Sequence, residues 1–378
     1  MNSIPYLLVA SLLFFLYLNE QRRVRCFSIS QSRRFALLIL LVFIGLRGHI
    51  YSDFISYYPW YENLPNIFEY SQISFTETYF EPGYVIFSAV IKAFVPNYYG
   101  WVFFNTLIDL LVLNYVFKRY TTSRILPYIF FLAFNGLLIE FNLYRNIKAI
   151  ELFLLSIPYI EQKKPIPYML FNILGMTFHS SSIIYLPAYF ILRASLPNLI
   201  KWGGIIFANV VFLAQVHVVG DLINSLGIFQ NIQAFDKLTG YTENSTTGYG
   251  FSFGYFERTF SMLLFTILYE KLCTQSPSNK IFYNCFWLYY VSFLFFYEVR
   301  VFVDRIPTLF VCAYWILYTN VIMLRFRYRQ LISTFALVVA ILKIYLPNTI
   351  PIARYENVLI GVRPYDVQRA VVESYFDK

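Results

Sequence analysis

Residues 101–117 read WVFFNTLIDLLVLNYVF and carry a single charged side chain, Asp109. A helix of this length spans most of the roughly 30 Å hydrocarbon core of a bilayer. Similar apolar stretches recur along the chain, separated by short polar breaks. Of the 378 residues, 58% are hydrophobic and 13% are charged, about half the charged share of a soluble domain. The sequence therefore predicts an all-α polytopic membrane protein with about 12 transmembrane helices, and it excludes a soluble enzyme.

The charged residues, cysteines and histidines exclude further classes. The net charge is +9, but the basic residues are spread over short loops, so we expect no nucleic-acid partner. The 4 cysteines have no paired spacing and the 3 histidines are scattered. We therefore expect neither a disulfide framework nor a metal site, and no cofactor.

The distribution of lysine and arginine predicts the orientation. One set of alternating loops holds 17 of the 30 basic residues against three acids, which makes these loops cytoplasmic and places both termini outside. The apolar stretch 83–95 would invert every later loop if it crossed the membrane, so we expect a re-entrant or interfacial helix there. We expect one transmembrane helical domain over 1–347, outer-face segments 48–100 and 219–256, and an outward-facing tail over 348–378.

Charged and polar side chains gather at the predicted outer boundary of the spans. Charged groups at this depth are energetically expensive, so each is a candidate functional residue. These candidates are Arg47, Asp53, Tyr57, Glu81, Arg145, His179, Arg258, Glu298, Arg300, Asp304 and Arg305. One guanidinium group can bind two phosphate oxygens at once, and a carboxylate can take a proton from a sugar hydroxyl. The set predicts glycosyl transfer from a lipid-pyrophosphate carrier at the outer face.

Structural interpretations of the same residues stay open. Arg47 and Arg258 could extend from span ends to the interface. Asp53, Glu81 and His179 could each mark a helix terminus, and the residues from Glu298 to Arg305 could form a structural ion-pair network. Within the spans, Asp109, Lys148 and Glu151 are expected to pair with one another and hold helices together.

The order of the outer-face motifs resembles the EpsG-type branch of the Wzy polysaccharide polymerases. The resemblance covers about residues 1–325 and departs from the family where Asp53 lies farther from Gly48 and where Asn146 replaces a Gln. The motifs that carry it are Arg47, Gly48, Asp53 and Tyr57; Glu81, Gly83 and Tyr84; Arg145 and Asn146; His179 and Ser181; and Arg300 and Arg305.

This resemblance implies a metal-independent, multi-span glycosyltransferase of the GT-C-like kind in a bacterial inner membrane. Its donor and acceptor would be undecaprenyl-pyrophosphate-linked repeat units of an O-antigen (lipopolysaccharide), capsule or exopolysaccharide. A chain-length regulator and a flippase would be its partners. Asp53 or Glu81 would be the general base, with His179 third. Arg47, Arg145, Arg300 and Arg305 would bind the pyrophosphate, and Tyr57, Tyr84, Asn146, Arg258, Glu298 and Asp304 would line the substrate site.

Three other functions remain open. An O-antigen ligase would use the same lipid donor, but the 219–256 segment is small for the outer domain of a ligase. A membrane O-acyltransferase would rest on His179, which the orientation places outside, away from a cytoplasmic acyl donor. A transporter or flippase would tend to show internal repeats, and the sequence has none.

Overall fold

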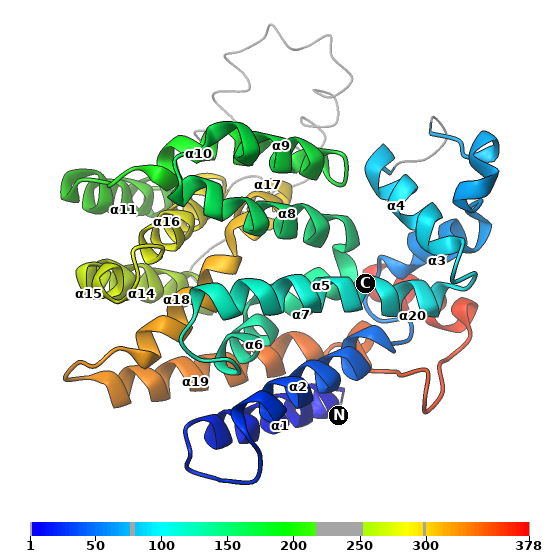
Figure 1. Ribbon diagram of the computed structural model, residues 1–378, viewed down its shortest axis with the longest axis horizontal. Helices are drawn as coiled ribbons and strands as arrows, with labels where there is room; N and C mark the ends of the chain where they lie inside the picture. The colour runs from blue at the N-terminus through cyan, green and yellow to red at the C-terminus, as the bar shows by residue number, and fades with distance from the viewer. Residues whose placement is uncertain (1, 76–79, 217–251, 298–299, 378) are drawn as a thin grey trace, which may run out of the picture. The chain divides into compact units, whose positions relative to one another are not determined.

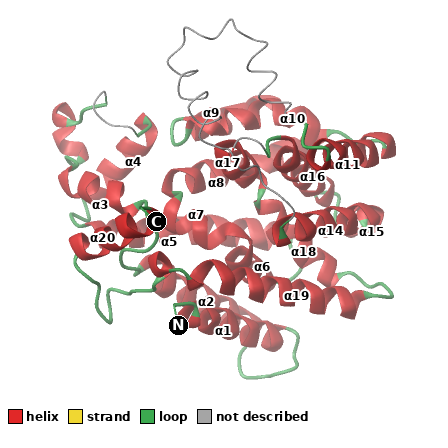
Figure 2. Ribbon diagram, turned by 180° about the vertical axis from the view of Figure 1, so that it is seen from behind, coloured by secondary structure: helices red, strands yellow, loops and turns green. Residues whose placement is uncertain are grey.

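Figure 1 shows the computed structural model of the chain, whose regular elements are helices. It describes residues 2–75, 80–216, 252–297 and 300–377, and the side chains of 300–304 lie outside the description. Within these ranges there is no strand beyond two isolated bridges, Arg47–Asn357 and Asn357–Gly361, as the view from behind in Figure 2 also shows. The predicted all-α class is confirmed for this part of the chain.

The chain divides into two compact units, Met1–Pro187 with Tyr314–Lys378, and Ala188–Ala313. The prediction of a single helical domain over 1–347 remains a prediction. The helices of the first unit are α1 (Ile4–Glu20), α2 (Ile29–Leu40), α3 (Phe54–Asn63), α4 (Pro82–Lys92), α5 (Tyr98–Tyr120), α6 (Leu126–Phe131), α7 (Leu137–Asn142), α8 (Tyr144–Glu161), α9 (Pro165–Met176), α19 (Arg329–Tyr345) and α20 (Tyr365–Phe376). Those of the second are α11 (Asn198–Leu213), α14 (Phe253–Ile267), α15 (Tyr269–Gln275), α16 (Asn279–Phe295) and α17 (Arg300–Phe310). The chain passes between the units within α10 (Tyr185–Arg193) and α18 (Cys312–Met323).

Shorter helical segments complete the described chain. Two are π-helical, and π-helical turns are rare and often occur at functional sites. They are η1 (Leu41–Gly45) and η3 (Leu132–Gly136). The 3-10 segments are η2 (Ile67–Gln72), η4 (Ser180–Ile184), η6 (Leu346–Thr349) and η7 (Pro351–Ala353).

Among the described residues, two helices are long and apolar enough to cross a membrane, Tyr98–Tyr120 and Arg329–Thr349. The first contains the apolar stretch 101–117, from which the sequence predicts a membrane protein. Shorter apolar helices are Ile4–Glu20, Pro82–Lys92, Leu126–Asn142, Pro165–Met176, Asn198–Leu213 and Cys312–Met323. The helix expected near 83–95 is present as α4, while its re-entrant character and the total of about 12 crossings stay predictions.

Packing within the first unit places three elements around the N-terminal end of α8. Helix α8 lies against α9 and against α5, and α4 lies against α5 (Figure 1). Helix α4 begins at Pro82 because proline is favoured in a first turn, where its missing N–H is not needed. These contacts bring the start of α4, the start of α8 and the turn after α9 to one place.

The C-terminal residues fold back onto the segment that follows η1. Gly48 N donates to Glu356 O at 3.0 Å, and Tyr51 N donates to Ile352 O at 2.8 Å. A Cβ on Gly48 would lie 2.9 Å from the Glu356 Cβ, so only glycine permits this approach. The predicted tail 348–378 is therefore a packed element that covers the loop leading to Asp53. Its outward orientation stays a prediction.

Candidate functional site

An ion pair between Arg145 and Glu81 joins two predicted site residues that are 64 positions apart. Arg145 Nη1 donates to Glu81 Oε2 at 2.5 Å, and Arg145 Nε donates to the Tyr57 hydroxyl at 3.0 Å. The side chains of Arg145 and Glu81 are 24% and 18% exposed. The pair is therefore shielded from bulk water and still open to a ligand. We name Arg145, Glu81 and Tyr57 the Arg145 site.

Glu81 owes its position to the close contact between α4 and the turn after α9. It is the N-cap residue of α4 but makes no capping bond, and its Oε1 accepts from Ser180 N at 3.0 Å instead. A Cβ on Gly83 would lie 2.1 Å from Thr177 Oγ1 and 2.8 Å from Thr177 O. Gly83 thus lets the first turn of α4 approach Thr177, and Tyr84 N donates to Thr177 O at 3.2 Å. The Glu-Pro-Gly-Tyr motif is explained by this contact.

His179 is the N-cap residue of η4, next to the residue that bonds Glu81. Its Nδ1 lies 2.6 Å from Ser181 Oγ and accepts from Ser181 N at 3.3 Å, and its side chain is buried. The local hydrogen bonds fit the helix-terminus interpretation that the sequence left open. A catalytic role for His179 stays a prediction.

Aromatic rings surround the Arg145 site. The ring centroids of Tyr57 and Phe80 are 4.9 Å apart in a stacked arrangement, and those of Tyr57 and Tyr144 are 4.6 Å apart. Trp60 stacks on Tyr84 at 5.8 Å. We name these residues the aromatic cluster, which consists of Tyr57, Trp60, Phe80, Tyr84, Trp101 and Tyr144.

The aromatic cluster also interacts with the charge of Arg145 and affects the pKa of Tyr57. The Arg145 guanidinium carbon lies 5.0 Å from the Phe80 ring centroid, a favourable cation–π distance. Burial raises the pKa of Tyr57, so its phenol stays protonated at neutral pH. Among the cluster residues, sequence reasoning missed Trp60, Phe80, Trp101 and Tyr144. The dense aromatic run YYPWY over 57–61 was the available signal for Trp60.

Asp53 lies at the start of α3, one helical turn before Tyr57. It occupies the N-cap position, yet its side chain makes no capping bond to the helix. The backbone N–H groups of Ser52 and Asp53 donate to Asn142 Oδ1 at 3.1 and 3.2 Å, which ties this turn to the end of α7. Asp53 is partly exposed.

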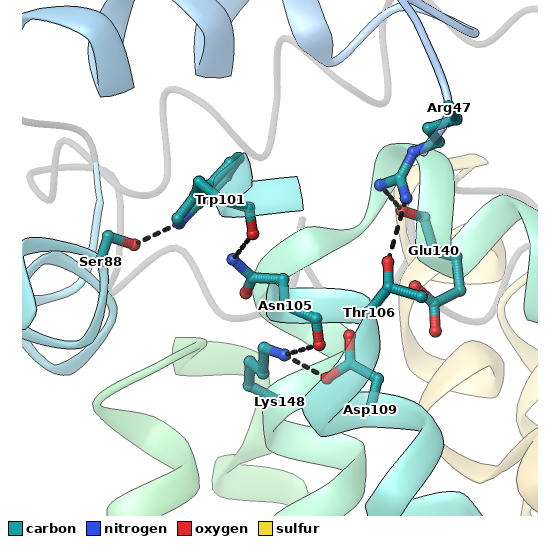
Figure 3. Close-up of polar contacts among 8 residues, drawn as sticks. All are labelled: Arg47, Ser88, Trp101, Asn105, Thr106, Asp109, Glu140 and Lys148. Atoms are coloured by element: carbon teal, nitrogen blue, oxygen red, sulfur yellow. Dashed lines mark hydrogen bonds and ion pairs between the residues drawn. The ribbon is translucent and has the colours of Figure 1, made fainter. Parts of the chain in front are cut away.

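Arg47 is buried and its guanidinium binds protein groups. Nη1 donates to Ile44 O at 2.8 Å and to Thr106 Oγ1 at 3.3 Å, and Nη2 donates to Glu140 O (Figure 3). Its guanidinium carbon lies 5.0 Å from the Phe141 ring centroid. Arg47 therefore joins the end of η1 to α5 and α7.

A second, buried ion pair lies one turn along α8 from Arg145. Lys148 Nζ donates to Asp109 Oδ1 and, at 3.2 Å, to Asn105 O (Figure 3). The expected pairing of Asp109 with Lys148 is confirmed. Glu140 and Glu151 are buried in the same region, with Asp109 as a neighbouring carboxyl group. We name Asp109, Lys148, Glu140 and Glu151 the buried network.

The remaining predicted site residues differ in how they are placed. Asn146 is buried next to Arg145. In the second unit, Arg258 Nε donates to the Tyr289 hydroxyl at 2.8 Å, and its guanidinium carbon lies 4.0 Å from the Phe293 ring centroid. Arg305 is exposed on α17. Glu298 and the side chains of Arg300 and Asp304 lie outside the described residues. The expected convergence of this group with Arg145 stays a prediction.

Within the described ranges, no three His, Cys, Asp or Glu side chains are grouped so that they could hold a metal ion.

A family model described as the EpsG family matches residues 32–365 of the chain. The match includes every candidate residue above and reaches beyond the expected resemblance into the packed C-terminal residues. No curated protein and no solved structure gives a significant match.

Proposed function

Because the chain belongs to the EpsG family, whose members are membrane proteins of polysaccharide biosynthesis, we propose that it joins lipid-linked oligosaccharide repeat units by glycosyl transfer. The donor and the acceptor are repeat units on undecaprenyl pyrophosphate. The reaction takes place at the outer face of a bacterial inner membrane, where it builds an O-antigen, a capsule or an exopolysaccharide. A chain-length regulator and a flippase are the partners that such a reaction implies.

The Arg145 site is the observation that carries this proposal. It combines a carboxylate, a guanidinium group and a phenol within hydrogen-bond distance, and the guanidinium group and the phenol ring both lie against the Phe80 ring. A carboxylate can accept the proton of a sugar hydroxyl, and a guanidinium group can bind phosphate oxygens. The partial exposure of Arg145 and Glu81 favours a site that substrate reaches.

In the proposed reaction, Glu81 takes the proton of the acceptor hydroxyl as the acceptor oxygen attacks the anomeric carbon of the donor. A new glycosidic bond forms while the bond from the anomeric carbon to the phosphate oxygen breaks. The lipid pyrophosphate leaves with the electron pair, and Arg145 stabilises its charge. Protonation of Glu81 removes the negative charge that holds Arg145, so the guanidinium group can turn to the phosphate as charge develops there.

The other candidate residues have supporting roles in the proposal. Asp53 is the alternative base, since it lies one turn from Tyr57 on the partly exposed end of α3, and His179 is the third. Arg300 and Arg305 stay candidates for pyrophosphate binding. With its donors directed at protein oxygens, Arg47 positions the segment leading to Asp53.

The experiment is a complementation of a gene deletion in the native host, read as surface-glycan length on a gel. The deletion should collapse the ladder to a single repeat unit. Glu81→Gln should leave it collapsed, while Asp53→Asn and His179→Gln should restore polymer, with equal membrane levels by immunoblot. Polymer from Glu81→Gln and none from Asp53→Asn would move the base to Asp53.

Loss of all repeats on deletion would favour a ligase or flippase, and an intact ladder with altered acylation would favour an acyltransferase that uses His179.

A further inference from the structure

A cavity of about 790 Å³ lies in the first unit where the end of α1 meets the connection between α18 and α19. Its lining includes four arginines, Arg23, Arg325, Arg327 and Arg329. Arg23 follows α1, and the other three lie about 300 positions later in the chain: Arg325 and Arg327 in the connection between α18 and α19, and Arg329 at the start of α19. The fold thus gathers positive charge from opposite ends of the sequence around one cavity.

No carboxylate forms an ion pair with any of these four arginines in the part of the chain that the structure describes. Arg329 Nε donates to Ile322 O at 2.7 Å, which fixes Arg329 at the end of α18. Arg23, Arg325 and Arg327 are exposed. Four like charges at one cavity repel one another, and an anion bound between them would relieve this repulsion.

The start of α19 adds to the positive potential. A helix N-terminus carries a partial positive charge, and acidic side chains normally favour that position. Here the first turn contains no acid, no side chain caps the helix, and Arg329 is the first residue. A helix N-terminus beside guanidinium groups is suited to a phosphate group.

The rest of the cavity lining is mixed: Gln21, Gln330, Ser333 and Thr334 are polar, and apolar side chains of α1 and α19 lie among them. Phe14 and Leu18 of α1 and Leu337 of α19 line the cavity, and α1 packs along α19 (Figure 1). Helix α19 belongs to a segment, Arg329–Thr349, that is long and apolar enough to cross a membrane. The cavity therefore combines arginines with apolar side chains from α1 and from a candidate transmembrane helix.

We propose that this cavity binds the phosphate headgroup of an anionic membrane phospholipid, with an acyl chain lying against Phe14, Leu18 and Leu337. An excess of arginine in cytoplasmic loops accounts for basic residues at this end of the helices. It does not account for their convergence on one cavity whose lining also includes Phe14, Leu18 and Leu337. In the predicted orientation the cavity is cytoplasmic, at the opposite face from the Arg145 site, so the inference does not depend on the proposed reaction.

The test compares two triple variants with equal loss of charge. Arg23→Gln/Arg325→Gln/Arg327→Gln removes cavity arginines, and Arg22→Gln/Arg25→Gln/Arg34→Gln removes exposed arginines at the same predicted face that do not line the cavity. The full-length protein is reconstituted in phosphatidylcholine nanodiscs containing a minor share of phosphatidylglycerol. Retained phosphatidylglycerol is then counted by native mass spectrometry.

Wild type and the second triple should retain phosphatidylglycerol over phosphatidylcholine, and the cavity triple should retain about tenfold less. Equal loss in both triples, or no preference in wild type, would overturn the proposal. Displacement of the lipid by inorganic pyrophosphate at low concentration would also overturn it, because the site would then take a soluble phosphate. If the cavity triple does not fold, as judged by gel filtration, the single variants Arg325→Gln and Arg327→Gln replace it under the same criteria.

Discussion

Helix α8 carries two ion pairs one turn apart, and they differ in almost every physical respect. Arg145 and Glu81 are 24% and 18% exposed, whereas Lys148 and Asp109 are 5% and 2% exposed. The outer pair is formed with the N-cap residue of α4 and lies against aromatic rings. The inner pair is formed with α5 and has further buried carboxyl groups beside it. The comparison indicates that burial, rather than residue type, separates a pair that can meet substrate from one that holds the helix in place.

Removal of the inner cation should have the largest effect on folding. Lys148→Met leaves Asp109 buried beside Glu140 and Glu151 without its cation, so the free energy of unfolding should fall by about 3–5 kcal/mol. Thermal unfolding of the detergent-purified protein measures this. The double variant Lys148→Met/Asp109→Leu should recover part of the loss because it removes both charges. Wild-type stability of Lys148→Met would break the comparison, since the inner pair would then not support the fold.

Removal of the outer cation should instead abolish activity and leave the fold intact. Arg145→Gln should lower the rate of polymer formation by about 10²–10³-fold, the range for loss of one charge-stabilising donor. Its unfolding free energy should change by about 1 kcal/mol or less, because partly exposed ion pairs contribute little. Arg119→Gln is the matched control, since Arg119 also pairs with a glutamate, Glu161, at partial exposure. Normal polymer in Arg145→Gln would remove Arg145 from the proposed mechanism.

The sequence allowed the inner pair to be predicted more completely than the outer site. Asp109 and Lys148 lie within apolar stretches, where a buried charge requires a partner, so their pairing followed from composition alone. The grouping of Glu81, Arg145 and Tyr57 at one face followed from the charge rule and motif order. Their direct contact did not follow, because it depends on how closely Gly83 approaches Thr177. That distance is a property of helix packing, which leaves no local pattern.

Two further features show the same limit. Arg47 has the sequence features of a substrate ligand, but its donors reach the backbone carbonyl groups of Ile44 in the adjacent η1 and of Glu140 in α7, which is 93 positions away. The segment after residue 347 has mixed composition and no clear periodicity, yet it packs against residues 48–51 through backbone hydrogen bonds. Backbone partners of this kind are determined by tertiary contact, and the sequence carries little trace of them.

The contact between α4 and the turn after α9 offers an intermediate test of the outer pair. Gly83→Ala places a Cβ within 2.1 Å of Thr177 Oγ1, so α4 must shift, at a cost of about 1–3 kcal/mol. The shift should separate Glu81 from Ser180 and lower polymer length, while the Lys148–Asp109 pair stays intact. Gly203→Ala is the control, because nothing lies within 4 Å of its added Cβ. Surface-glycan gels and thermal unfolding of both variants provide the measurement.

The smallest expected effect comes from the phenol that bonds Arg145. Tyr57→Phe removes the hydrogen bond from Arg145 Nε and keeps the ring that stacks on Phe80, so activity should fall by about ten- to a hundredfold, equivalent to one hydrogen bond to a charged group. Stability should stay close to wild type, since Arg145 keeps its ion pair with Glu81. The initial rate of polymer formation in membranes from the complemented strain measures this change. A loss as large as that of Arg145→Gln would mean that the Tyr57 hydroxyl contacts the substrate directly. The outer group in the comparison with the Lys148–Asp109 pair would then be all three residues of the Arg145 site and not the ion pair alone.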